Sequence, residues 1–112
     1  MHQNISDGFK RQGPQLDQAL AAFITDLETR GMLENTLVIV AGDFGRTPKI
    51  NSNSGRDHWG SLCSLIFAGG KNEYGRLIGK ADRLMTIPDE NPIKPHDVAK
   101  TIFDHFGVVN TQ

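Results

Sequence analysis

The sequence of 112 residues has little cysteine, no excess of either charge and no long hydrophobic run. Its single cysteine, Cys63, excludes an internal disulfide and a metal cluster built only of cysteines. Twelve Lys and Arg residues against 13 Asp and Glu residues give a net charge of −1, which argues against a nucleic-acid-binding protein. The longest apolar runs, residues 37–41 and 65–68, are far shorter than the roughly 20 residues of a membrane-spanning helix. We therefore expect neither a nucleic acid nor a membrane as a partner.

Two segments have the apolar spacing of amphipathic helices. The first covers residues 14–31, with Pro14 suited to a first helical turn and Gly31 to a helix end. Its apolar residues fall on one helical face: Leu16, Leu20, Phe23, Ile24 and Leu27. The second begins near Pro95 and ends at Gly107, with an apolar stripe of Val98, Ile102 and Phe106.

Short apolar runs between these helices predict strands. Residues 37–41 are continuous and β-branched, which favours a strand buried on both faces, as in a parallel sheet. Residues 62–68 predict a second strand, and short edge strands are expected around 77–78 and 84–87. A helix that leads into a buried strand is typical of α/β folds, and no linker divides the chain. The sequence thus predicts one domain over residues 1–112, with a modest core.

Polar residues that can carry chemistry gather in the loop predicted over residues 42–60. Asp43 directly follows the first strand, where its carboxylate can bind a metal ion or cap a turn. His58 stands beside Asp57 and Trp59. Its imidazole is either a metal ligand, with Asp57 or a backbone carbonyl accepting from the other ring nitrogen, or a surface side chain stacked on Trp59.

The same loop is locally basic. Arg46 and Arg56 are candidate contacts for a phosphate or sulfate, although arginines in loops more often hold the loop in place. No Gly-x-Ser-x-Gly motif surrounds any serine or threonine, so we expect no catalytic nucleophile in this chain.

The motifs GDFGRTP (residues 42–48) and GRDHW (residues 55–59) together resemble the GEFGRTP/GRDHW signature of an uncharacterised bacterial family. That family belongs to the alkaline phosphatase and sulfatase superfamily. The predicted helices and strands occur in the family's order, so the resemblance covers essentially the whole chain. It implies the C-terminal part of an alkaline phosphatase-like α/β sandwich, in which helices flank a mostly parallel sheet.

The resemblance also implies a divalent metal site for Zn, Mn, Mg or Ca. Asp43, where the family usually has Glu, is similar to a metal-binding carboxylate of the superfamily, and His58 to its later histidine ligand. His2 resembles the histidine of the family's Trp-Asp-x-His-x-Asn stretch, whose Trp and Asp this chain lacks. Phe44 stands where typical phosphatases and sulfatases have a further histidine ligand, which argues against a complete site for two ions.

The function that this resemblance implies is the C-terminal portion of a sulfatase-like or phosphatase-like metal-dependent hydrolase. The substrate would be a small anionic ester, with Arg46 and Arg56 as oxyanion contacts. We expect this portion to be inactive alone and to need the family's N-terminal portion, or self-association, for stability. Full-length relatives look exported, but residues 1–11 contain no signal peptide. The alternative is a non-catalytic module that binds an anion or a metal.

Overall fold

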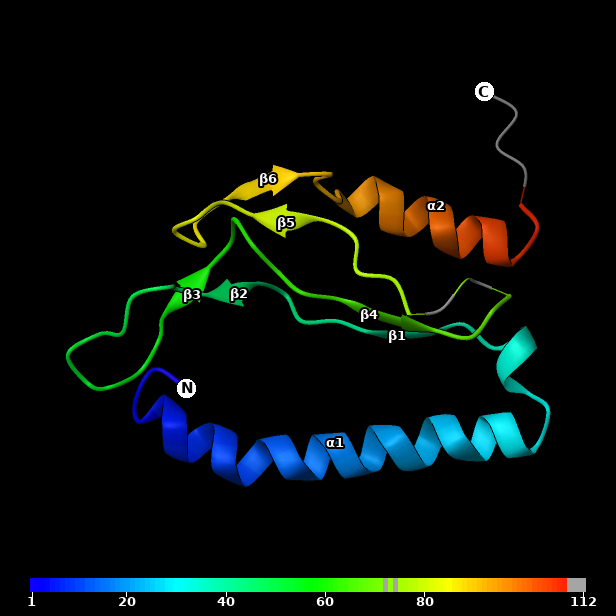
Figure 1. The fold of residues 1–112 in the computed structure, drawn as a ribbon, viewed down its shortest axis with the longest axis horizontal. Coiled ribbons are helices and arrows are strands. Elements are labelled where there is room, and N and C mark those ends of the chain that lie inside the picture. Colours follow the sequence, from blue (N-terminus) through cyan, green and yellow to red (C-terminus); the bar gives the residue numbers. More distant parts are fainter. Residues whose placement is uncertain (72, 74, 109–112) are drawn as a thin grey trace.

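The computed structural model describes residues 1–71, 73 and 75–108. Within these residues, two α-helices lie on either side of three small sheets, each of two antiparallel strands (Figure 1). The predicted mostly parallel sheet is therefore wrong. Apolar runs locate strands, but they do not determine the direction in which a strand pairs, and here every strand pair is antiparallel. No helix of the described residues is long and apolar enough to cross a membrane.

The first helix, α1 (Ile5–Thr29), begins nine residues before the predicted start and contains Pro14 in its interior. Its first turn is capped from a distant loop, because the backbone N–H groups of Asn4 and Ile5 donate to carbonyls of residues 53 and 54. Such a cap satisfies the free donors of a helix start without any local sequence motif. The predicted end is confirmed, since Gly31 takes the left-handed conformation with φ of 67°.

A 3-10 turn, η1 (Leu33–Asn35), leads into β1 (Val38–Val40), which pairs with β4 (Ile66–Ala68). Ile39 lies opposite Phe67 in this pair. The strands predicted at 37–41 and 62–68 thus exist in shorter form. The prediction that the first is buried on both faces is wrong, because all three β1 residues are half-buried.

The loop predicted over residues 42–60 contains a strand pair, β2 (Gly45–Arg46) with β3 (His58–Trp59). A third pair joins β5 (Lys80–Ala81) to β6 (Pro88–Glu90). The edge strands predicted at 77–78 and 84–87 are therefore wrong. The carboxylate of Asp82 accepts from the backbone N–H groups of Thr86 and Ile87, which folds the second segment into a turn. Residues 72 and 74 of the predicted turn region lie outside the described residues.

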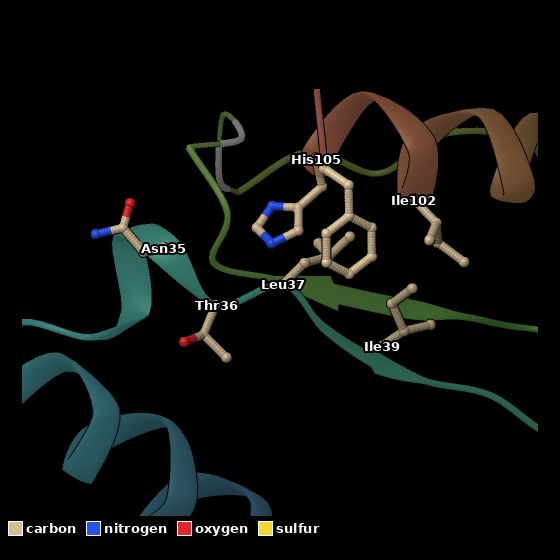
Figure 2. Close-up of a pocket in the computed structure, with 7 residues that line it drawn as sticks. Asn35, Thr36, Leu37, Ile39, Ile102 and His105 are labelled. Atoms are coloured by element: carbon tan, nitrogen blue, oxygen red, sulfur yellow. The ribbon is translucent and has the colours of Figure 1, made fainter. Parts of the chain in front are cut away.

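The last helix, α2 (Pro95–His105), confirms the predicted start at Pro95. The Asp97 carboxylate accepts from the Lys94 backbone N–H at 2.8 Å, and Gly107 follows the helix end with φ of 69°. Ile102 and His105 of α2 point toward Leu37 and Ile39, and an open cavity of about 330 Å³ lies between them (Figure 2).

The described residues bury little apolar surface, with Leu27, still 7% exposed, as the one buried hydrophobic side chain among them. The accessible surface is 9006 Å², whereas a folded monomer of this mass is expected to expose about 6,100 Å². The radius of gyration is 16.6 Å, against about 13 Å for a compact domain of this length. The core is thus smaller than the composition predicts, and long-range polar contacts have a larger share in fixing the chain.

Candidate functional site

The start of the chain and the segment between β2 and β3 form one polar cluster. The blue end of α1 lies beside the green loop that joins these strands (Figure 1). Three backbone hydrogen bonds hold the two segments together, from Asn4 to Asn53, from Ile5 to Ser54 and from Arg56 to Met1. The β2–β3 register places Arg46 opposite His58. His2 is thereby brought to residues 46–58.

His2 and His58, here called the imidazole pair, face each other through their Nε2 atoms at 3.0 Å. Their ring centroids are 4.6 Å apart. The other ring nitrogen of His2, Nδ1, lies 2.8 Å from Oδ1 of Asp57. A carboxylate that accepts from one nitrogen of a histidine orients the ring and leaves the opposite nitrogen for a ligand. Asp57 plays this part for His2, whereas the sequence predicted it for His58.

The protonation states in this cluster follow from its contacts. Hydrogen bonds from His2 and then Asn51 hold the pKa of Asp57 below its ordinary value of 3.8, so its carboxylate is ionised at neutral pH. Since an ionised carboxylate only accepts, Nδ1 of His2 donates in this contact, while Nε2 of His2 faces Nε2 of His58 and Nη1 of Arg46. Desolvation, followed by the positive charges of His2 and Arg46, lowers the pKa of His58 below 6.5. The His58 imidazole is therefore neutral at pH 7.

The two candidate anion-binding arginines lie in different settings. Nη1 of Arg46 is 3.3 Å from Nε2 of His2 and also donates to the Arg56 carbonyl at 3.1 Å. Nη1 of Arg56 donates to the carbonyls of Thr47 and Pro48. Arg56 thus holds the loop in place, which is the structural alternative that the sequence left open, while Arg46 lies at the imidazole pair.

Phe44, next to Asp43 in the chain, contacts the ring of His58. The Phe44 ring packs on the His58 ring with centroids 4.0 Å apart. Trp59 instead donates through Nε1 to the Thr86 carbonyl at 2.7 Å, so Phe44, not Trp59, is the aromatic partner of His58. Asp43 is exposed, and among the described residues no three His, Cys, Asp or Glu side chains converge as a metal site.

The cluster therefore fits a metal ion in part. Two imidazole nitrogens at 3.0 Å, one of them oriented by a carboxylate, are suitable donors for a borderline-soft cation such as Zn²⁺. The His2 and Asp57 side chains are 52% and 53% exposed, so the pair is open to a ligand from solvent. Among residues 1–71, 73 and 75–108 no third ligand of the His, Cys, Asp or Glu type joins the pair, and Asp43 as that ligand stays a prediction.

Asn51 is a member of the cluster that the sequence analysis did not identify. Its side-chain amide donates to the His2 carbonyl at 3.0 Å and to Oδ1 of Asp57 at 3.1 Å. Its Oδ1 accepts from the backbone N–H groups of Asn53 and Gly55. The available signal was the Asn-Ser-Asn-Ser run just before GRDHW, since such residues commonly bond the backbone of a turn.

Comparison with known proteins shows the family of the chain. The family described as Protein of unknown function (DUF1501) matches residues 1–112, and the chain belongs to this family. No curated protein matches the chain. No solved structure matches it either.

Proposed function

We propose that this DUF1501 chain supplies the C-terminal part of a metal-dependent hydrolase site for phosphate or sulfate esters. In this proposal His2 and His58 are two nitrogen ligands of a divalent cation, and Arg46 contacts the anionic group of the ester. The observation that carries it is the 3.0 Å approach of the two Nε2 atoms, with Nδ1 of His2 held by Asp57. The resemblance to the alkaline phosphatase and sulfatase superfamily supports the same assignment.

The charges of the cluster support two kinds of ligand. The neutral imidazole of His58 suits a cation, because only a deprotonated nitrogen coordinates. Arg46 lies at the imidazole pair with a planar group that suits two oxygens of a phosphate or sulfate. When bound, a divalent cation would supply Lewis-acid polarisation of the ester group. This chain's own residues would bind and orient that group.

These residues alone are not expected to hydrolyse an ester. Phe44 occupies the position next to Asp43 where a further ligand is expected, and its ring packs on His58 without any atom that coordinates a metal. In the described part of the chain, no group of three His, Cys, Asp or Glu side chains gathers at the imidazole pair, and the sequence predicts no nucleophile. We expect hydrolysis to need further ligands and a nucleophile from outside these residues.

A non-catalytic module that binds an anion or a metal is the second candidate function. The observation that favours it is the use of both arginines on backbone carbonyls, Arg46 on Arg56 and Arg56 on Thr47 and Pro48. Such contacts are typical of a loop fixed for structural reasons. Hydrolysis of p-nitrophenyl phosphate or sulfate by a longer protein that contains this chain would exclude this candidate.

Calorimetric titration with Zn²⁺ and with Mn²⁺ tests the metal assignment. We expect His2→Ala and His58→Ala each to weaken binding at least about tenfold, since each removes a directly coordinating nitrogen. Asp43→Ala tests the predicted third ligand. His96→Ala is the matched control, because this histidine lies on α2 with its side chain 75% exposed and no contact with the imidazole pair. Unchanged affinity in both His2→Ala and His58→Ala would refute the assignment.

A further inference from the structure

Asn51 links the two groups that position His2, namely the backbone of His2 and the carboxylate that accepts from its ring. It is half-buried, and four hydrogen bonds engage both ends of its side-chain amide. Two bonds from its Nδ2 go to the His2 carbonyl and to the Asp57 carboxylate, which itself accepts from the His2 ring. One NH₂ group therefore holds both the backbone of His2 and the acceptor of its side chain.

The other end of the amide folds the loop. Oδ1 accepts from the Asn53 N–H at 2.9 Å and from the Gly55 N–H at 3.0 Å. These two bonds involve only the loop's own backbone, whereas the two Nδ2 bonds involve His2 and Asp57. The acceptor end and the donor end of Asn51 thus have separable roles.

We infer that Asn51 is a positioning residue, which fixes the Nδ1–H tautomer of His2 by holding Asp57 and the His2 backbone in register. In this tautomer the lone pair of Nε2 points to His58 and Arg46, the two groups that lie 3.0 and 3.3 Å from it. An Asp57 carboxylate without the Asn51 donor has one contact fewer to fix its rotamer. The His2 ring then loses the acceptor that selects its tautomer.

The consequence for metal binding rests on the function proposed above. Partners that orient a coordinating histidine contribute about 10–100-fold to metal affinity in known sites. We expect loss of the Asn51 donor to weaken Zn²⁺ binding by at least about tenfold, although Asn51 itself touches no metal.

Three variants separate positioning from folding. Asn51→Asp keeps the size of the side chain and an oxygen that accepts from Asn53 and Gly55, but it replaces the donor to His2 and Asp57 with a second carboxylate oxygen, which repels the Asp57 carboxylate from its place at His2. Asn51→Ala removes both ends. Asn53→Ala is the matched control, because it is the same change two residues away and the described contacts of Asn53 are made by its backbone.

The readout is the pair of ¹⁵N chemical shifts of the His2 ring at pH 8, which reports the tautomer directly, together with Zn²⁺ affinity. We expect the Nδ1–H tautomer to dominate in the original chain and in Asn53→Ala, and the Nε2–H tautomer to become the major one in Asn51→Asp and Asn51→Ala. A dominant Nε2–H tautomer in the original chain overturns the inference without reference to any variant. Retention of the Nδ1–H tautomer in Asn51→Asp also overturns it, even if Zn²⁺ affinity falls.

Different results would refute the metal assignment and the positioning role of Asn51. If the tautomer changes in Asn51→Asp but the original chain binds no Zn²⁺, the positioning role is supported and the metal assignment is refuted. If His2→Ala and His58→Ala abolish binding but both Asn51 variants bind as the original chain does, the metal assignment is supported and the positioning role is refuted.

Discussion

Replacement of Gly55 by alanine should detach the start of the chain from the β2–β3 loop. Gly55 is buried, and a Cβ placed on it would lie 2.1 Å from both the carbonyl carbon and the oxygen of His2. It would also lie 2.5 Å from the backbone nitrogen of Gln3, where ordinary contact begins at 3.4 Å. Because all three atoms belong to backbone, no rotamer change relieves the overlap, and the segment must move by roughly 1 Å or more.

Such a movement breaks the backbone bonds from Asn4 to Asn53, from Ile5 to Ser54 and from Arg56 to Met1. Each is worth about 0.5–1.5 kcal/mol, so local detachment should cost about 1.5–4.5 kcal/mol. Hydrogen exchange measures this locally, and the protection factors of the Asn4 and Ile5 amides should fall by about 10-fold or more. The far end of α1, near Leu27, should keep its protection.

Gly60→Ala is the matched control, because nothing lies within 4 Å of a Cβ at that position. It makes the same chemical change in the same polar region and should leave the Asn4 and Ile5 amides protected. Equal protection of these amides in Gly55→Ala and in the original chain would refute the packing of His2 against Gly55, and with it the geometry of the imidazole pair.

Two other measurements test neighbouring contacts. The pKa of Asp57 is lowered in the folded chain, so the contribution of its carboxylate to the attachment of His2 is complete above the ordinary pKa of 3.8 and is lost as the pH falls through the lower pKa of the folded chain. The protection factor of the Asn4 amide should therefore fall on acidification from pH 5 to pH 2. A constant protection factor would contradict the His2–Asp57 contact. Trp59→Phe removes the donor to the Thr86 carbonyl and should destabilise the chain by about 1 kcal/mol in urea unfolding followed by circular dichroism, whereas an unchanged midpoint would show that this bond contributes nothing.

The sequence predicts local elements well where their causes are local. Pro95 and Asp97 start α2 and Gly107 follows its end, and all three are local to this helix. The start of α1 could not be predicted in this way, because its cap consists of carbonyls about 50 residues away in the chain. Pro14, which looked like a first turn, is accommodated in the helix interior.

Strand pairing likewise depends on contacts between distant residues, so the sequence predicts it poorly. The runs at 37–41 and 62–68 indicate β1 and β4, but an apolar run gives no direction of pairing and no measure of what covers its faces. The apolar residues 84–87 form a turn and not the predicted strand, because a carboxylate such as that of Asp82, which accepts from two backbone N–H groups, competes with strand formation.

The structure brings together only some of the residues that the sequence predicted for the candidate site, since Asp43 is exposed and Arg56 donates to loop carbonyls. His2, His58 and Arg46 lie in contact, and their role as a binding site stays a prediction. Asp57 or a backbone carbonyl was expected to accept from His58, yet Asp57 accepts from His2, because the start of the chain brings the His2 ring to both side chains, with Nδ1 at Asp57 and Nε2 at His58. A contact between residues 55 positions apart could not be read from the local spacing of GRDHW.

The hydrogen bonds that attach His2 are worth about as much as the entropy lost when the chain between His2 and Asp57 is closed. A bound cation would therefore contribute noticeably to the ordering of His2. His2 and Asp57 are 55 positions apart, and closing a flexible loop of that length costs about 3.5 kcal/mol. The three backbone bonds and the Asn51 bond to the His2 carbonyl together return about 2–6 kcal/mol. Since these terms nearly cancel, part of any metal-binding free energy would be spent on ordering His2. Metal affinity should then report on the attachment of His2 as well as on coordination.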